Sequence, residues 1–178
     1  MSLWKPFSRD PMLASVAALH AAIISQARQR AFYTTGGVPD SIDGRFEMIT
    51  LHSYLILRRL RGAGERANRL SQALVNAIFA DLDASLREMG AGDLGVGKRV
   101  KRMATAFYGR AAAYEAAENA HHQAEAFQRN LFGTVTPMPN QLAAMVTYVN
   151  AASAALAEQP LDEILAGRPA FPALESTV

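Results

Sequence analysis

The stretch GRFEMITLHSYLILRRLR, residues 44–61, decides the fold class of this chain. Its apolar side chains cover nearly the whole circumference of a helix. They are Phe46, Ile49, Leu51, Tyr54, Leu55, Ile56, Leu57 and Leu60. A helix that is apolar on all sides is usually buried at the centre of a domain. We therefore predict a central helix over residues 44–61, around which the rest of the chain packs.

Other stretches with apolar residues at helical spacing flank this segment. We predict helices over residues 11–30, 65–89, 98–109, 110–132 and 140–158, with Gly109 either kinking or ending the helix from residue 98. We also predict at most a short helix over 161–166 and an extended tail over 168–178. Alanine, the strongest helix former, supplies about a fifth of the residues, and no segment alternates as a half-buried strand does. The sequence predicts an all-α fold of about six helices in a single compact domain over residues 1–178.

The composition excludes several classes of protein. The length of 178 residues is typical of one domain. The chain contains no cysteine, which rules out disulfides, thiolate metal centres and a cysteine nucleophile and suits a reducing cytoplasm. The net charge is only +2, so the overall charge gives no reason to expect binding to DNA.

The N-terminal region permits two interpretations. Lys5 and Arg9 precede an apolar stretch over residues 12–24, which is the outline of a signal peptide. Asp10 and Pro11 are instead typical of the N-cap and first residue of an ordinary helix, and we favour this interpretation. No run reaches the ~18 consecutive apolar residues of a membrane span. We therefore expect any membrane contact to be peripheral.

Two motifs with possible chemistry lack their required context. Residues 92–98, GDLGVGK, match the start of a phosphate-binding loop, but Arg99 stands where magnesium needs Ser or Thr. Glu118 and His121 have the spacing of di-iron helical bundles, but the second such pair is missing. His121, His122 and Glu125 on one helix supply too few ligands for a metal site. The sequence predicts no catalytic residue, no metal and no cofactor, and hence not an enzyme.

The charges around residues 98–102 are unusual for a helix start. Lys98, Arg99, Lys101 and Arg102 fall in the first turns of the helix predicted from residue 98, where the helix dipole disfavours cations. A glycine-rich connection over residues 91–97 precedes them. Two interpretations remain open: a face that binds a polar partner, or a solvated helix whose cations pair with nearby carboxylates of the same chain.

Several blocks of the sequence resemble the ubiquinol–cytochrome c chaperone family. These blocks are Asp43–Met48 with Leu51 and His52, Phe79–Asp83, Leu86–Gly90, Gly92–Leu94, Val96–Met103, Ala106–Arg110, and Arg168-Pro169 with Phe171. They occur in order over about residues 36–172. Each block alone is weak, but together they are specific.

The resemblance implies an all-helical assembly factor of the cytochrome bc1 complex that performs no catalysis. Mitochondrial members hold newly made cytochrome b, work with a small partner subunit and associate with the translating ribosome. The chain lacks their long N-terminal presequence region. The resemblance therefore implies a bacterial member that acts in the cytoplasm, with peripheral contact at the cytoplasmic face of the inner membrane.

We predict that the partner-binding surface is built by the end of the helix over 65–89, the glycine-rich connection and the start of the next helix. The residues assigned to it are Asp81, Asp83, Arg87, Glu88, Asp93, Lys98, Lys101, Arg102, Tyr108 and Arg110. Glycines at 90, 92, 95 and 97 would leave backbone groups accessible, and Tyr108, if exposed, would add an amphipathic anchor.

Two alternatives stay beside this hypothesis. One is a helical bundle that binds a small apolar ligand, such as a quinone or a lipid, in a gap between alanine-rich helices. A deep apolar pocket with convergent polar groups would favour it. A flat or grooved surface that mixes charged and exposed apolar groups would favour the chaperone. The weaker alternative is contact of the basic cluster with RNA, against which the low net charge counts.

Overall fold

The structure is a computed structural model that describes residues 10–88 and 93–175. Every regular element in these two ranges is a helix, and six of the eight have seven residues or more. They are α1 (Pro11–Ala27), α2 (Arg30–Thr34), α3 (Ile42–Leu60), α4 (Glu65–Glu88), α5 (Asp93–Glu115), α6 (Ala120–Asn130), α7 (Pro139–Glu158) and α8 (Leu161–Leu165). The predicted all-α fold is confirmed.

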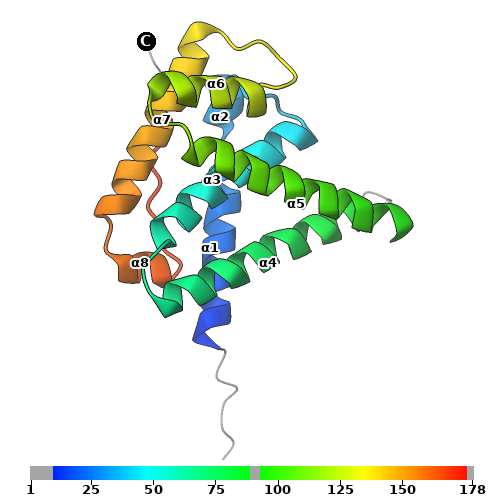
Figure 1. Ribbon diagram of the computed structural model, residues 1–178, viewed down its shortest axis with the longest axis vertical. Coiled ribbons are helices and arrows are strands. Elements are labelled where there is room, and N and C mark those ends of the chain that lie inside the picture. Colours follow the sequence, from blue (N-terminus) through cyan, green and yellow to red (C-terminus); the bar gives the residue numbers. More distant parts are fainter. Residues whose placement is uncertain (1–9, 89–92, 176–178) are drawn as a thin grey trace, which may run out of the picture.

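Helix α3 lies in the middle of the molecule, with α1, α4, α5 and α7 packed around it (Figure 1). Most of its residues are buried, including the fully covered Leu51, Ile56 and Leu60. The Ser41 hydroxyl caps its start by accepting the Gly44 N–H at 3.1 Å. A Cβ at Gly44 would lie 1.9 Å from the Pro39 carbonyl oxygen, so only glycine fits this close approach. The predicted central helix is confirmed.

Helix α1 begins as predicted but ends sooner. The Asp10 carboxylate accepts the Met12 N–H at 2.9 Å, and Pro11 is the first helical residue. The helix stops at Ala27, and Gln29 adopts extended backbone before α2 begins at Arg30. The Tyr33 hydroxyl donates to the Ala27 carbonyl at 2.7 Å and so satisfies an oxygen that the break leaves open. The prediction of one helix through residue 30 was wrong, because no glycine or proline marks the break.

Helices α4 and α5 run in opposite directions and converge at the edge of the molecule away from α7 and α8 (Figure 1). Helix α5 begins at Asp93, so residues 93–97 are helical rather than a glycine-rich connection, and that prediction was wrong. Glycine lowers helix stability by only about 1 kcal/mol per residue. A Cβ at Gly97 would meet nothing within 4 Å. The predicted turn residues 90 and 92 lie outside the described residues.

The earlier start of α5 changes the electrostatics of its basic cluster. Lys98 is the sixth residue of the helix, not the first. The effect of the helix dipole falls off within the first turn, so it does not disfavour these cations as the sequence suggested. At the other end, α5 continues through Gly109 to Glu115, and a separate α6 begins at Ala120. The predicted single helix over residues 110–132 was therefore also wrong.

The break between α5 and α6 has its own cap. The Asn119 side chain accepts the His122 N–H at 3.0 Å, which satisfies an N–H group at the start of α6. This hydrogen bond is strictly local, but Asn is common enough in loops and on helix surfaces that the sequence alone did not separate the two helices.

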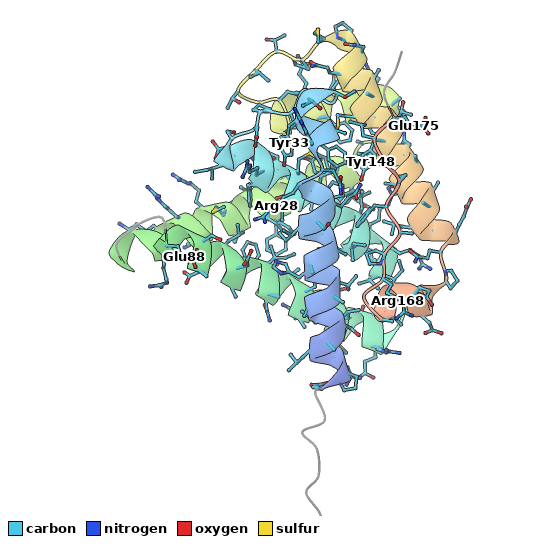
Figure 2. The ribbon with its side chains drawn as sticks, turned by 180° about the vertical axis from the view of Figure 1, so that it is seen from behind. Arg28, Tyr33, Glu88, Tyr148, Arg168 and Glu175 are labelled. Carbon is cyan, nitrogen blue, oxygen red and sulfur yellow. The ribbon has the colours of Figure 1, made fainter. Side chains whose placement is uncertain are left out.

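The chain after α8 runs back beside α7, from Arg168 to Glu175 (Figure 2). The Gln159 side chain holds it at two points, donating to the Arg168 carbonyl at 2.7 Å and accepting the Ala170 N–H at 2.9 Å. Phe171 packs against the core. The predicted tail is therefore non-helical, and its described part packs against the core through the partly buried Phe171 and Leu174.

A buried polar network joins this segment to the centre of the fold. His52 is fully buried; its Nδ1 lies 2.7 Å from the Met48 carbonyl oxygen and its Nε2 lies 2.7 Å from the Tyr148 hydroxyl. A carbonyl only accepts, so Nδ1 carries the proton and Nε2 accepts from Tyr148. Gln26 donates to both Tyr148 and the Pro172 carbonyl, at 3.1 and 3.0 Å. Both ring nitrogens of this fully buried histidine therefore have hydrogen-bond partners.

Among the helices described here, none is both long and apolar enough to cross a lipid bilayer.

Candidate partner-binding site

Helix α5 presents two different faces. One face lines a groove and carries residues spaced by three and four along the helix, namely Arg99, Arg102, Met103, Ala106 and Arg110. Lys98, Lys101, Thr105 and Tyr108 do not line the groove and are exposed on another side of the helix. Of the three basic residues assigned to the site near the start of α5, Lys98, Lys101 and Arg102, only Arg102 reaches the groove.

The groove is formed by the start of α3, the middle of α5, the end of α6 and the segment that follows α6. Its volume is about 770 Å³. The remaining residues that line it are Pro39, Ile42, Asp43, Gly44, Phe46, Glu47, Arg129, Asn130, Leu131, Gly133 and Thr134. Ile42 leaves 64% of its surface exposed and Phe46 is buried, so apolar groups extend from the core to the groove's surface. The site is a groove of mixed apolar and charged character.

A buried ion pair forms part of this lining. The Arg110 Nε donates to Glu47 Oε1 at 2.6 Å, and Arg110 also contacts the second carboxylate oxygen of Glu47. The Glu47 side chain is only 5% exposed and that of Arg110 is 26% exposed. Burial raises the pKa of Glu47, while the bonds from Arg110 act in the opposite direction. The Arg110 guanidinium also lies 5.7 Å from the centre of the Phe46 ring. Arg110 is thus already engaged by its own chain.

The other cations of α5 differ from Arg110 in this respect. Within residues 10–88 and 93–175, no ion pair or side-chain hydrogen bond joins Lys98, Arg99, Lys101 or Arg102 to a carboxylate. The described structure therefore gives no support to the alternative in which neighbouring carboxylates neutralise this cluster. An unpaired cluster of cations on a helix adjoining an apolar groove is suited to binding a polar partner.

The predicted acidic residues Asp81, Asp83 and Glu88 lie on α4 and do not line the groove, while Asp93 is the first residue of α5. The Asp81 carboxylate is 3.7 Å from Nε2 of His20 on α1. Asp83 accepts from Arg87 Nε at 2.7 Å, one turn along the same helix. Glu88 is exposed at the end of α4. The Asp93 side chain lies outside the described residues. The structure thus keeps Asp81, Asp83, Arg87 and Glu88 together on α4, but it does not bring them into the groove.

Tyr108 is 56% exposed, which meets the condition set for it as an anchor. Its ring packs edge-on against Phe107, with 5.5 Å between centroids, and lies 6.4 Å from Phe79 of α4. These contacts hold the ring in place without covering it. An exposed, well-supported tyrosine provides apolar area together with a hydroxyl for hydrogen bonding.

Several residues of the groove were not predicted from the sequence. Ile42, Phe46, Glu47, Arg129 and Leu131 were not assigned to the site, although all five line it. The spacing of Arg99, Arg102, Ala106 and Arg110 was a signal that these side chains share a face. No sequence signal places Arg129 or Leu131 beside them, because α6 reaches the groove only through tertiary packing.

Among the side chains described, no three histidine or acidic residues are close enough together to hold a metal ion. The His121 Nε2 lies 3.5 Å from a Glu125 carboxylate oxygen on an exposed face of α6.

The fold and the groove define a class: a compact helical protein with an open, cationic and partly apolar binding groove. The family model for the ubiquinol–cytochrome C chaperone matches residues 34–171. The crystal structure of the Cbp3 homolog from Brucella abortus is similar, with a TM-score of 0.82 and 36% sequence identity over 92% of each chain. Comparison with curated sequences gives no significant match. The chain belongs to the ubiquinol–cytochrome c chaperone family, which confirms the resemblance in its sequence.

Proposed function

We propose that this protein is an assembly chaperone of the cytochrome bc1 complex that binds newly made cytochrome b and catalyses no reaction. Membership of the ubiquinol–cytochrome c chaperone family supports the assembly role. The observation that carries the binding role is the groove of about 770 Å³, where unpaired cations adjoin exposed apolar groups. A membrane-protein client outside the bilayer exposes both apolar surface and charged loops, and such a groove complements both.

The proposed binding surface combines the groove with the exposed parts of α4 and α5. Arg102 lines the groove, while Lys98 and Lys101 add positive potential beside it. Tyr108 provides an aromatic contact. Asp81, Asp83, Arg87, Glu88 and Asp93 are proposed as polar contacts on the hairpin of α4 and α5. Arg110 is proposed to act through Glu47, by fixing the shape of the groove, rather than as a free donor.

The second candidate function is binding of a small apolar ligand such as a quinone or lipid. The volume of the groove falls within the range of about 300–1,000 Å³ that is usual for small-molecule sites, and a polar pair converges there. The groove is open to solvent, and its Arg99 and Arg102 make no ion pair among the described residues, which fits a protein client better. We retain the ribosome, a small partner subunit and the cytoplasmic face of the inner membrane as proposed contacts from the family, without a surface assigned to them.

A cellular experiment tests the assembly role. The gene is deleted from its native host, and the amount of assembled bc1 complex in membranes is measured from its haem spectrum and by native electrophoresis. We expect the complex to be depleted in the deletion strain and restored by the wild-type chain. Normal amounts of bc1 complex without the protein would contradict the proposal. Accumulation of a quinone or lipid bound to the purified protein would favour the second candidate.

A further inference from the structure

Three of the four arginines that line the groove come from two helices and lack strong partners within the described chain; the fourth, Arg110, is paired with Glu47. Arg99 and Arg102 lie on α5 and have no carboxylate within ion-pair distance among the described residues. Arg129 lies on α6, and its guanidinium is 4.0 Å from Glu125, at the limit of an ion pair. The groove's own acids are Asp43 and the Glu47 carboxylate that Arg110 already neutralises. The groove therefore carries an excess of positive charge.

The same groove exposes apolar surface between these cations. Ile42, at the start of α3, is 64% exposed, and Met103 and Ala106 of α5 are half-buried. Leu131, buried after the end of α6, completes this apolar lining. An occupant that fits must bury an apolar stripe and place negative charge beside it. A guanidinium binds a carboxylate in a two-point geometry, which makes carboxylates suitable acidic groups.

We propose that the groove binds an amphipathic helical segment of the client, with carboxylates on the flanks of an apolar stripe. The inference rests on the proposed function and names the client chemistry that the same site selects. A volume of about 770 Å³ accommodates about two turns of a helix that is about 10 Å across. Cations on two different helices require negative groups in more than one position. A helix with acidic flanks supplies these groups, whereas one lipid headgroup concentrates its charge at a single point.

Helix α5 itself supplies a matched control. Arg99 and Arg102 line the groove, and Lys98 and Lys101 lie on the same turns of the helix but outside the groove. Arg99→Gln/Arg102→Gln and Lys98→Gln/Lys101→Gln therefore remove the same charge from the same helix. Glutamine keeps a long side chain and a similar helix propensity. Thermal melts of both double variants establish that each is folded.

The probe is a fluorescein-labelled helical peptide of alanine, leucine and glutamate, with leucines in one stripe and glutamates on both flanks. A second peptide has lysine in place of every glutamate. Binding to the full chain is followed by fluorescence anisotropy. We expect the glutamate peptide to bind and the lysine peptide not to bind. We expect an affinity loss of about tenfold in Arg99→Gln/Arg102→Gln and of about twofold in the lysine control.

Equal losses in the two double variants, or equal binding of the two peptides by the wild-type chain, would overturn the inference. The comparison of the two peptides uses the wild-type protein, so it tests the inference even if a variant unfolds. In a further arm, vesicles of phosphatidylcholine and phosphatidylglycerol compete with the glutamate peptide. Displacement by these vesicles, but not by pure phosphatidylcholine, would assign the groove to an anionic lipid surface instead.

Capture of cytochrome b by the same proteins separates this inference from the proposed function. If the wild-type chain captures cytochrome b and both double variants capture it equally, the groove inference fails and the proposed function stands. If no cytochrome b is captured while the peptide pattern holds, the proposed function fails and the groove keeps its selectivity for acidic amphipathic helices.

Discussion

Arg110 and Glu47 form a two-point ion pair across the interface of α5 and α3, with Arg110 Nε 2.6 Å from Glu47 Oε1. The pair links the helix that carries the basic cluster to the central helix of the fold. Arg110 and Glu47 are 63 residues apart in the sequence, so their ion pair also fixes the register of α5 against α3. Through it, the shape of the groove depends on the core.

Replacing Arg110 with Met should destabilise the protein at neutral pH. The substitution leaves the buried Glu47 carboxylate without its partner, and we expect the unfolding free energy to fall by about 3 kcal/mol. This value is at the low end for broken buried ion pairs because the Arg110 side chain is partly exposed. Urea denaturation at pH 7 measures this loss. The difference from wild type should shrink at acidic pH, because the pKa of Glu47 is raised and its carboxyl becomes neutral. A loss that stays below about 0.5 kcal/mol at pH 7, the size of an ordinary surface substitution, would contradict this account of the pair.

A charge in the middle of α3 should prevent stable folding. Ile56 is fully buried, and Ile56→Asp places an unpaired carboxylate in the core, at a cost of about 4 kcal/mol or more. Leu60→Asp should behave in the same way, since Leu60 is also fully covered. The control is Ile42→Asp, because Ile42 is exposed in the first turn of the same helix, where a negative charge is favoured. Melting of Ile56→Asp within a degree or two of wild type would refute the central position of α3.

Helices could be located from the sequence where several local signals coincide. Residues 44–61 showed a fully apolar helix, and Asp10-Pro11 showed a helix start; both are confirmed. The break after Ala27 was missed because no glycine or proline marks it, and the side-chain hydrogen bond from Tyr33 that stabilises it has no distinctive sequence signal. The start of α5 was misplaced because glycines at 95 and 97 were taken as a turn, although their cost to a helix is small enough for other contacts to offset.

The candidate site was predicted only in part. The basic cluster of residues 98–102 and the anchor Tyr108 could be identified from charge and from the family resemblance. The groove could not, because its lining comes from segments more than eighty residues apart, from Pro39 to Thr134. Charge pattern alone also did not separate the groove-lining Arg99 and Arg102 from Lys98 and Lys101. That separation depends on which side of α5 faces α3 and α6.

The buried His52 predicts a loss of stability in mild acid. Burial lowers the pKa of His52 from 6.5 to about 4. A group whose pKa is depressed on folding binds its proton more tightly in the unfolded chain, so its stabilising contribution is present above pH 6.5 and is lost as pH falls towards 4. The full loss is about 3 kcal/mol, since each pKa unit corresponds to about 1.4 kcal/mol. Urea unfolding between pH 7 and pH 4 measures it.

The His52→Gln variant serves as the comparison for this pH dependence. Gln at 52 does not titrate, so the unfolding free energy of the variant should fall less between pH 6.5 and 4 than that of the wild-type chain. Parallel curves for the two proteins would show that the acid sensitivity has another origin, such as the carboxylates of the surface ion pairs.

Two buried tyrosines should respond in opposite ways to loss of the hydroxyl. No hydrogen-bond partner for the Tyr114 hydroxyl is present among the described residues, so Tyr114→Phe should leave stability unchanged or raise it by about 1 kcal/mol. The Tyr148 hydroxyl bonds both His52 and Gln26, so Tyr148→Phe should cost about 1–3 kcal/mol by leaving polar groups unsatisfied. Equal destabilisation of both variants in thermal or urea unfolding would contradict these assignments.

The central claim is that this chain captures cytochrome b through the cationic surface of α5. The most direct test is affinity purification of the tagged protein from native membranes, followed by mass spectrometry, with the wild-type chain and Lys98→Ser/Lys101→Ser/Arg102→Ser compared side by side. These three side chains make no ion pair among the described residues, so the melting temperature of the triple variant should stay close to that of the wild-type chain. We predict that cytochrome b co-purifies with the wild-type chain, and that the folded triple variant captures about tenfold less of it and yields less bc1 complex in cells. A folded triple variant that captures cytochrome b and supports assembly as well as the wild-type chain does would contradict the claim.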